Sequence, residues 1–309
     1  MFAAAMAKQA LAIKGKRGTR RHGPAYNCRM PYPTSPATRN RLIGYWWAPV
    51  MLIAVILAVA AYLHPYQPLA LSDISPQVVA TTAALDPSFG KPIARSFKYA
   101  TRRSYSSAAG LVEVEIRVTL QPMGKGLVMR QDDWYDLGGR SVVYQERYVL
   151  FRNLFSVHTR SREVAPLVHD LMGRVGWYND SVESLGSTLE GGMPDSAAWK
   201  LDLVMDRLSD TDGKSLTLQT TRYQRRQHCE RSGQVDGTGI GAGFSGAYPK
   251  ISCRSHTSEQ SAERRSEYVW LAEHGIFLSM GFQQAAETPE KPDTALEAKG
   301  RYVSFEALP

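Results

Sequence analysis

The chain has 309 residues, of which 43% are hydrophobic and 21% are charged, and this composition excludes a wholly disordered or collagen-like protein. Three cysteines are too few for a small scaffold held together by disulfides. The net charge is +8, but residues 1–41 hold nine lysines and arginines and no acid, so the other residues carry −1. Because the basic excess is confined to this tail, the charge argues against a nucleic-acid-binding body.

Residues 42–63 form a stretch of 22 residues without a charge, with aromatic residues near both ends. A helix of this length reaches about 33 Å, which matches the ~30 Å hydrocarbon core of a bilayer. The nine cations precede the stretch, and no lysine or arginine follows it until Lys91. The sequence therefore predicts one membrane-spanning helix with the basic tail in the cytoplasm.

Two other interpretations of this stretch stay open. It could be a cleaved signal peptide, because Ala58-Val59-Ala60 has the small-x-small pattern of a cleavage site and Met30 could be the true start. It could also be a buried core helix, although such helices are rarely so long and free of charge. With an anchor or a signal peptide the following residues are exported. We therefore expect a bacterial inner-membrane protein whose C-terminal domain lies in the periplasm.

The remaining chain divides into a tether and a domain. Residues 64–95 contain five prolines among small and polar residues, which favours an extended stalk, with a short helix over 76–85 as one option. Residues 96–309 form the exported domain, either as one unit or as two sub-domains split near residue 195.

From residue 96 the hydrophobic pattern has a period of two, as in strands with one buried and one exposed face. Alternation and turn signals predict strands over 112–120, 126–135, 141–151, 154–160, 198–208, 214–228, 265–273, 276–284 and 300–306. Apolar residues at helical spacing predict an amphipathic helix over 164–175, and a shorter helix is expected after Asp180. This order indicates an α+β fold: a mostly antiparallel sheet with one or two helices on a face.

Cys229 and Cys253 are the two cysteines of the exported domain, and they flank a glycine-rich loop at 232–247. In an oxidising compartment we expect them to form a disulfide that holds this loop. A zinc site with His228 and His256 is one alternative, although neighbours on a strand point to opposite faces, which separates His228 from Cys229. Unpaired thiols are the other. We expect no metal and no cofactor.

A group of polar residues could contact a ligand. Asp132, Asp133 and Asp136 cluster beside Trp134, and such a group could hold a hard cation or contact a sugar, although it also fits a polar strand end. Ser245 is close to the pattern of a hydrolase nucleophile but lacks the helix that should follow. These five residues are the candidate ligand contacts, and no catalytic set is complete.

Basic residues also cluster in the second half of the domain. The cluster comprises Arg222, Arg225, Arg226, Arg264 and Arg265. Glutamates lie close to them in the sequence, so we expect a salt-bridged outer face rather than a binding patch.

These observations predict a membrane-anchored, non-enzymatic envelope protein whose exported domain binds a protein or another envelope partner, as an assembly subunit or an immunity-type inhibitor. One alternative is an envelope hydrolase that acts on lipid or glycan through Ser245 or the aspartate group. Another is a half-open sheet that carries a lipid. No nucleic-acid partner is expected.

Overall fold

The computed structural model describes residues 49–56, 69–107, 110–135, 142–163, 177–212, 218–258, 260–286 and 295–308. Residues 49–56 are helical and belong to a different unit from the one that contains the strands. Across the described ranges, no helix combines the length and the apolar content needed to cross a membrane. The predicted membrane-spanning helix over 42–63 is therefore not found: its central part is helical, and its other residues lie outside the described ranges.

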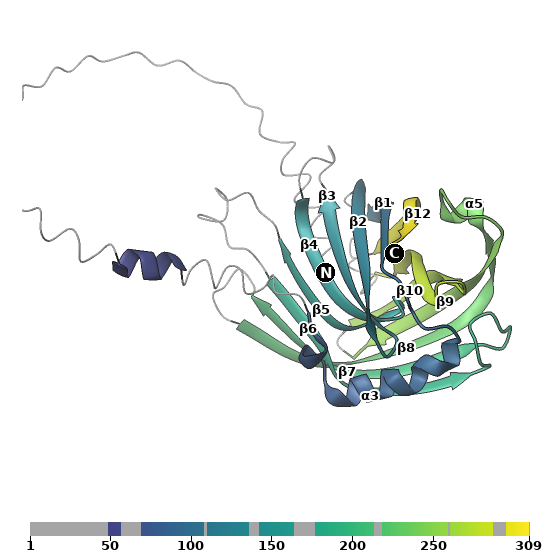
Figure 1. The fold of residues 1–309 in the computed structure, drawn as a ribbon, viewed down its shortest axis with the longest axis horizontal. Helices are drawn as coiled ribbons and strands as arrows, with labels where there is room; N and C mark the ends of the chain where they lie inside the picture. The colour runs from purple at the N-terminus through teal and green to yellow at the C-terminus, as the bar shows by residue number, and fades with distance from the viewer. Residues whose placement is uncertain are drawn as a thin grey trace, which may run out of the picture. The chain divides into compact units, whose positions relative to one another are not determined.

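Twelve strands form one closed antiparallel barrel, in which each strand pairs with its neighbours in the chain and β1 pairs with β12 (Figure 1). The strands are β1 (Phe97–Ser107), β2 (Gly110–Gly124), β3 (Leu127–Tyr135), β4 (Val142–Phe151), β5 (Phe155–Glu163), β6 (Trp177–Glu190), β7 (Lys200–Asp212), β8 (Leu218–Asp236), β9 (Ala247–Thr257), β10 (Gln260–Leu271), β11 (Ile276–Gln284) and β12 (Leu296–Ala307). The strands on the two sides of residue 195, β6 and β7, are neighbours in this one barrel.

The expected α+β class is wrong, because in the strand-containing unit only short helices are described beside the barrel. They are η2 (Leu71–Asp73), α3 (Pro76–Leu85), η3 (Asp86–Phe89) and α5 (Gly237–Ile240). The helix expected after Asp180 is part of β6. A bulge between Val182 and Ser184 puts the buried Val182 and Leu185 three residues apart, which imitates helical spacing. The helix predicted over 164–175 lies outside the described residues.

One half of the barrel, at the end that contains the tight turns from β2 to β3, β4 to β5 and β10 to β11, is apolar, and on β3 and β4 its buried residues lie on both faces of the sheet. The segment from η2 to η3, which the sequence analysis assigned to the stalk, packs against this half, and α3 lies along the lower side of the barrel in Figure 1. The ring of Phe89 lies 5.3–6.3 Å, between centroids, from Phe151, Trp199, Trp270 and Phe277. This segment therefore closes the apolar end.

Two strand pairs are short, and other segments cover the exposed edges. Beyond the stretch of β6 that pairs with β5, Gln77 of α3 accepts from the Leu185 amide at 3.1 Å and donates to the Leu185 carbonyl at 3.2 Å. β11 pairs with β12 over only four residues, and the Ala242 amide donates to the Tyr302 carbonyl at 3.2 Å. Gly241 (φ +151°) makes this approach feasible, because a Cβ there would lie 2.1 Å from the same carbonyl oxygen.

Candidate functional site

The other half of the barrel interior is lined by charged side chains, a region that we call the arginine lumen. Its members share the inner face with the buried core residues, since side chains two apart on a strand point the same way. Arg207, for example, continues the buried series Leu201, Leu203 and Met205 on β7. The described charged residues of this face are Arg103, Arg130, Arg207, Arg225, Arg264, Asp132, Glu146 and Asp180. Five cations therefore face three described acids.

Two of the arginines are fully paired. Arg130 donates to both carboxylate oxygens of Asp132, at 2.6 and 2.5 Å, and to Asn153 at 3.1 Å. Arg207 donates to Asp180 at 3.0 Å and to the Ser156 carbonyl at 2.9 Å. All four of these charged residues are at most 7% exposed, so each pair is a desolvated, hydrogen-bonded ion pair.

Phenol groups surround the charges. The tyrosines on the inner face are Tyr99, Tyr105, Tyr144, Tyr148, Tyr178, Tyr223, Tyr268 and Tyr302. Tyr178 and Tyr223 both donate to Asp180 at 2.8 Å. Burial raises the pKa of Tyr99, Tyr105 and Tyr302, so these hydroxyls stay protonated and can donate hydrogen bonds. The lumen is thus rich in donors as well as in positive charge.

Glu146 is the lumen carboxylate without an arginine ion pair. Its Oε2 accepts from Trp134 Nε1 at 3.2 Å and from the Tyr148 hydroxyl. It faces Asp132 across β3 and β4, and burial, followed by this second carboxylate, raises the pKa of Glu146 to about 7. Near neutral pH the side chain therefore exchanges between charged and neutral forms.

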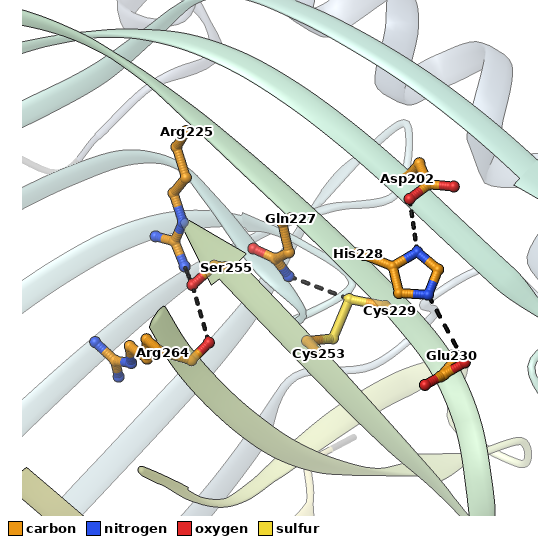
Figure 2. Close-up of a disulfide and its surroundings, with 9 residues drawn as sticks. All are labelled: Asp202, Arg225, Gln227, His228, Cys229, Glu230, Cys253, Ser255 and Arg264. Carbon is orange, nitrogen blue, oxygen red and sulfur yellow. Dashed lines mark hydrogen bonds and ion pairs between the residues drawn. A yellow bond between two sulfur atoms is a disulfide. The ribbon is translucent and has the colours of Figure 1, made fainter. Parts of the chain in front are cut away.

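Three arginines, Arg103, Arg225 and Arg264, form no ion pair with any acid of the described chain. Arg225 donates to Ser255 at 3.3 Å, and the guanidinium of Arg264 lies 3.8 Å over the ring of Phe282. Burial, followed by the charges of Arg207 and Arg264, lowers the pKa of Arg225 to about 10. Burial likewise lowers the pKa of Arg264. Figure 2 shows Arg225 and Arg264 near each other on the side of the sheet that carries the disulfide.

The structure separates the residues that the sequence grouped as ligand contacts. Asp132 and Trp134 face the arginine lumen. Asp133 lies on the outer face of β3, where it accepts from Gln145 at 2.7 Å, and Asp136 lies outside the described residues. Ser245 is exposed in the loop before β9.

Most lumen residues were missed by the sequence analysis. Of the expected salt-bridged outer face, Arg222 is exposed and forms an ion pair with Glu183 at 3.4 Å. Arg226 and Arg265 are exposed as well, whereas Arg225 and Arg264 point inward. The available signal was the position in the strand rather than the residue type. Arg225 alternates with Gln227 and Cys229, so its side chain points to the same face as these two buried residues. The many charges nearby in the sequence suggested solvent exposure instead.

The disulfide prediction is confirmed: Cys229 and Cys253 are bonded directly across β8 and β9, with Cα atoms 4.0 Å apart. Both cysteines are buried on the inner face, where Figure 2 shows them next to Gln227. His228 points the other way, and its Nδ1 lies 2.6 Å from Asp202 on the outer face. The zinc alternative is therefore wrong.

Comparison with known proteins gives no relative: no family model, curated protein or solved structure matches this chain.

Proposed function

We propose that the barrel is a binding protein that holds a small anionic molecule in the arginine lumen without converting it chemically. The observation that carries this proposal is that Arg103, Arg225 and Arg264 face inward without a carboxylate partner in the described chain. Guanidinium groups match phosphate, sulfate and carboxylate groups through paired hydrogen bonds. An anion of this kind would complete the charge balance of the lumen.

The energetics support a ligand rather than a purely structural role. A charge withdrawn from water without a partner is costly, and the half-buried Arg225 shows this cost as a lowered pKa. The neighbouring Arg207 is compensated by Asp180, so the same barrel can pair inner-face arginines internally. Arginines kept inward without such a partner reduce stability, and binding of an anion recovers it.

The other functions expected from the sequence gain less support. The candidate hydrolase groups are not assembled, because Asp132 and Asp133 lie on opposite faces of β3 and Ser245 is exposed on a loop. The expected half-open sheet is not found, since the barrel is closed, and carriage of a lipid stays a prediction. A protein or envelope partner stays a prediction, and no single feature of the described surface favours one.

The proposal is tested with a double variant and a matched control. Arg225→Gln with Arg264→Gln removes two inner guanidiniums, whereas Arg226→Gln with Arg265→Gln removes their exposed sequence neighbours. Sulfate binding is measured by calorimetry at low ionic strength, with tetramethylammonium as a cationic control. We expect the inner variant to weaken sulfate binding by at least roughly a hundredfold, because each of the two lost charge-assisted hydrogen bonds contributes ~1.5–3 kcal/mol.

The outer variant should bind sulfate like the parent chain. Without anion, the inner variant should melt at the same temperature as the parent or higher, since it has lost uncompensated charges. Equal sulfate affinity in the inner variant and the parent, or no sulfate binding by the parent at all, would reject the proposal.

We also propose that the barrel folds in an oxidising compartment, the bacterial periplasm expected from the sequence. The buried Cys229–Cys253 bond supports this location, because such bonds are rare in a reducing cytosol. In a Cys28→Ser background, denatured cell extracts are treated with a thiol-reactive polymer. We expect no labelling before reduction and two labels after it. Two labels before reduction would contradict the location, and a further Cys229→Ser change supplies the single-label control.

A further inference from the structure

Glu146 is the lumen residue whose charge is least fixed by its neighbours. From β3, Asp132 and Arg130 face it with opposite charges, and Arg130 already uses both oxygens of Asp132. From β4 and β1, the phenols of Tyr148 and Tyr105 lie near it. Among these groups no cation forms an ion pair with Glu146, so its ionised form is stabilised by the hydrogen bonds from Tyr148 and Trp134 and by the more distant charge of Arg130.

A chain of aromatic contacts connects Glu146 to the arginines that lack acidic partners. Trp134, which donates to Glu146, stacks on Tyr105 with centroids 5.8 Å apart. Tyr105 in turn lies 6.4 Å from the ring of Phe282, over which the Arg264 guanidinium sits at 3.8 Å. Inside the barrel, the rings of Trp134, Tyr105 and Phe282 thus form a chain of contacts between Glu146 and Arg264.

We propose that Glu146 is a proton-binding residue of the anion site, so that an anion enters the arginine lumen together with a proton on the Glu146 carboxyl. This inference rests on the proposed function. An ionised Glu146 adds a negative charge to the lumen and repels the anion, whereas a neutral Glu146 leaves the field of the arginines undiminished. Glu146 therefore selects for anion binding at acidic pH.

Thermodynamic linkage determines the direction of the pH dependence of anion binding. The pKa of free Glu146 is about 7, and a nearby anion raises this pKa further. Binding must then be tightest below the pKa of the free protein and weakest above the pKa of the complex. A rise of one pKa unit would limit the change in sulfate Kd to about tenfold.

The test uses sulfate, whose charge is constant over this pH range, and the full chain. We expect the sulfate Kd to weaken about tenfold from pH 5.5 to pH 8.5. Glu146→Gln should bind with one pH-independent Kd close to the pH 5.5 value of the parent, because glutamine mimics the neutral acid. Glu263→Gln, on the exposed outer face of β10, should keep the pH dependence of the parent.

A second measurement needs no variant. Calorimetry in two buffers of different ionisation enthalpy at pH 7.5 reports protons taken up on binding, and we expect a net uptake of up to about one proton. Sulfate binding with the same Kd at every pH and no proton uptake would overturn this inference but leave the proposed function intact. Absence of sulfate binding at every pH would overturn both.

Discussion

Asp180 is the most heavily hydrogen-bonded acid of the described lumen. It accepts from Arg207 and from the hydroxyls of Tyr178 and Tyr223, which lie on three different strands. Burial alone would raise the pKa of Asp180, but Arg207 and these hydrogen bonds outweigh it and lower the pKa. The network therefore stays charged and fully paired at neutral pH, in contrast to Arg225 and Arg264.

Asp180→Asn should be strongly destabilising, because it leaves Arg207, 2% exposed, without a counter-charge. We expect a loss of about 3–5 kcal/mol in urea unfolding at pH 7. The Asp180 carboxylate contributes fully to stability above its ordinary pKa near 3.8, and this contribution is lost as the pH falls through the lowered pKa of the folded protein. The difference in stability between the variant and the parent should therefore shrink in strong acid. Asp202→Asn, at the exposed pair with His228, should cost less than about 1 kcal/mol.

The sequence located part of the candidate site correctly and missed its basic half. Asp132 and Trp134 were singled out because acids beside an aromatic are conspicuous, and both face the lumen. Arg225 and Arg264 were assigned to the outer face because other charges adjoin them. The face to which they point depends on strand register, and a slip of one residue would turn them to the opposite face. The register is fixed by the pairing of β8 and β10 with β9, which the local charge pattern does not show.

At the scale of elements, α3 protects an edge of the barrel that would otherwise be open. Gln77 presents both an acceptor and a donor to the backbone of Leu185, as a neighbouring strand would. An unpaired stretch of strand is a site for unwanted pairing with other chains, and a covering helix removes it. The helix is thus a structural part of the barrel rather than of a tether.

Gln77→Ala should expose this edge. The Leu185 amide loses its partner, and an unsatisfied buried group costs ~1–3 kcal/mol. The Leu185 carbonyl loses the bond from Gln77 but keeps the one from the Thr81 hydroxyl at 3.4 Å. We expect faster amide hydrogen exchange at Leu185 and a lower melting temperature. Gln121→Ala, an exposed position on β2, should change neither quantity. Unchanged exchange at Leu185 in the Gln77 variant would show that α3 does not protect the edge.

Regular strands were predictable, and irregular ones were not. The strand expected over 276–284 coincides with β11, and 141–151 differs from β4 by one residue. β6 was mistaken for a helix because its bulge breaks the period of two. The sequence pattern does not predict β9, because a proline and the preceding glycine-rich loop interrupt its alternation.

At the scale of the whole molecule, the sequence pattern did not show that the sheet closes into a barrel. Alternating strands are compatible with an open sheet under helices or with a barrel, since both bury one face. Which of the two architectures forms depends on the pairing of β1 with β12, which lie about two hundred residues apart in the chain. No local pattern encodes this pairing. The α+β expectation failed at this point, although most of the strands were correctly placed.

The pairing of β1 with β12 also has a consequence for synthesis of the protein. β1 emerges early from the ribosome, yet its outer partner is the last strand to be made. Until β12 has been synthesised, the nascent sheet has two unpaired edge strands and its polar inner face is open to solvent. A premature stop at the first residue of β12, Leu296, would thus leave an open sheet prone to aggregation, not a slightly smaller barrel.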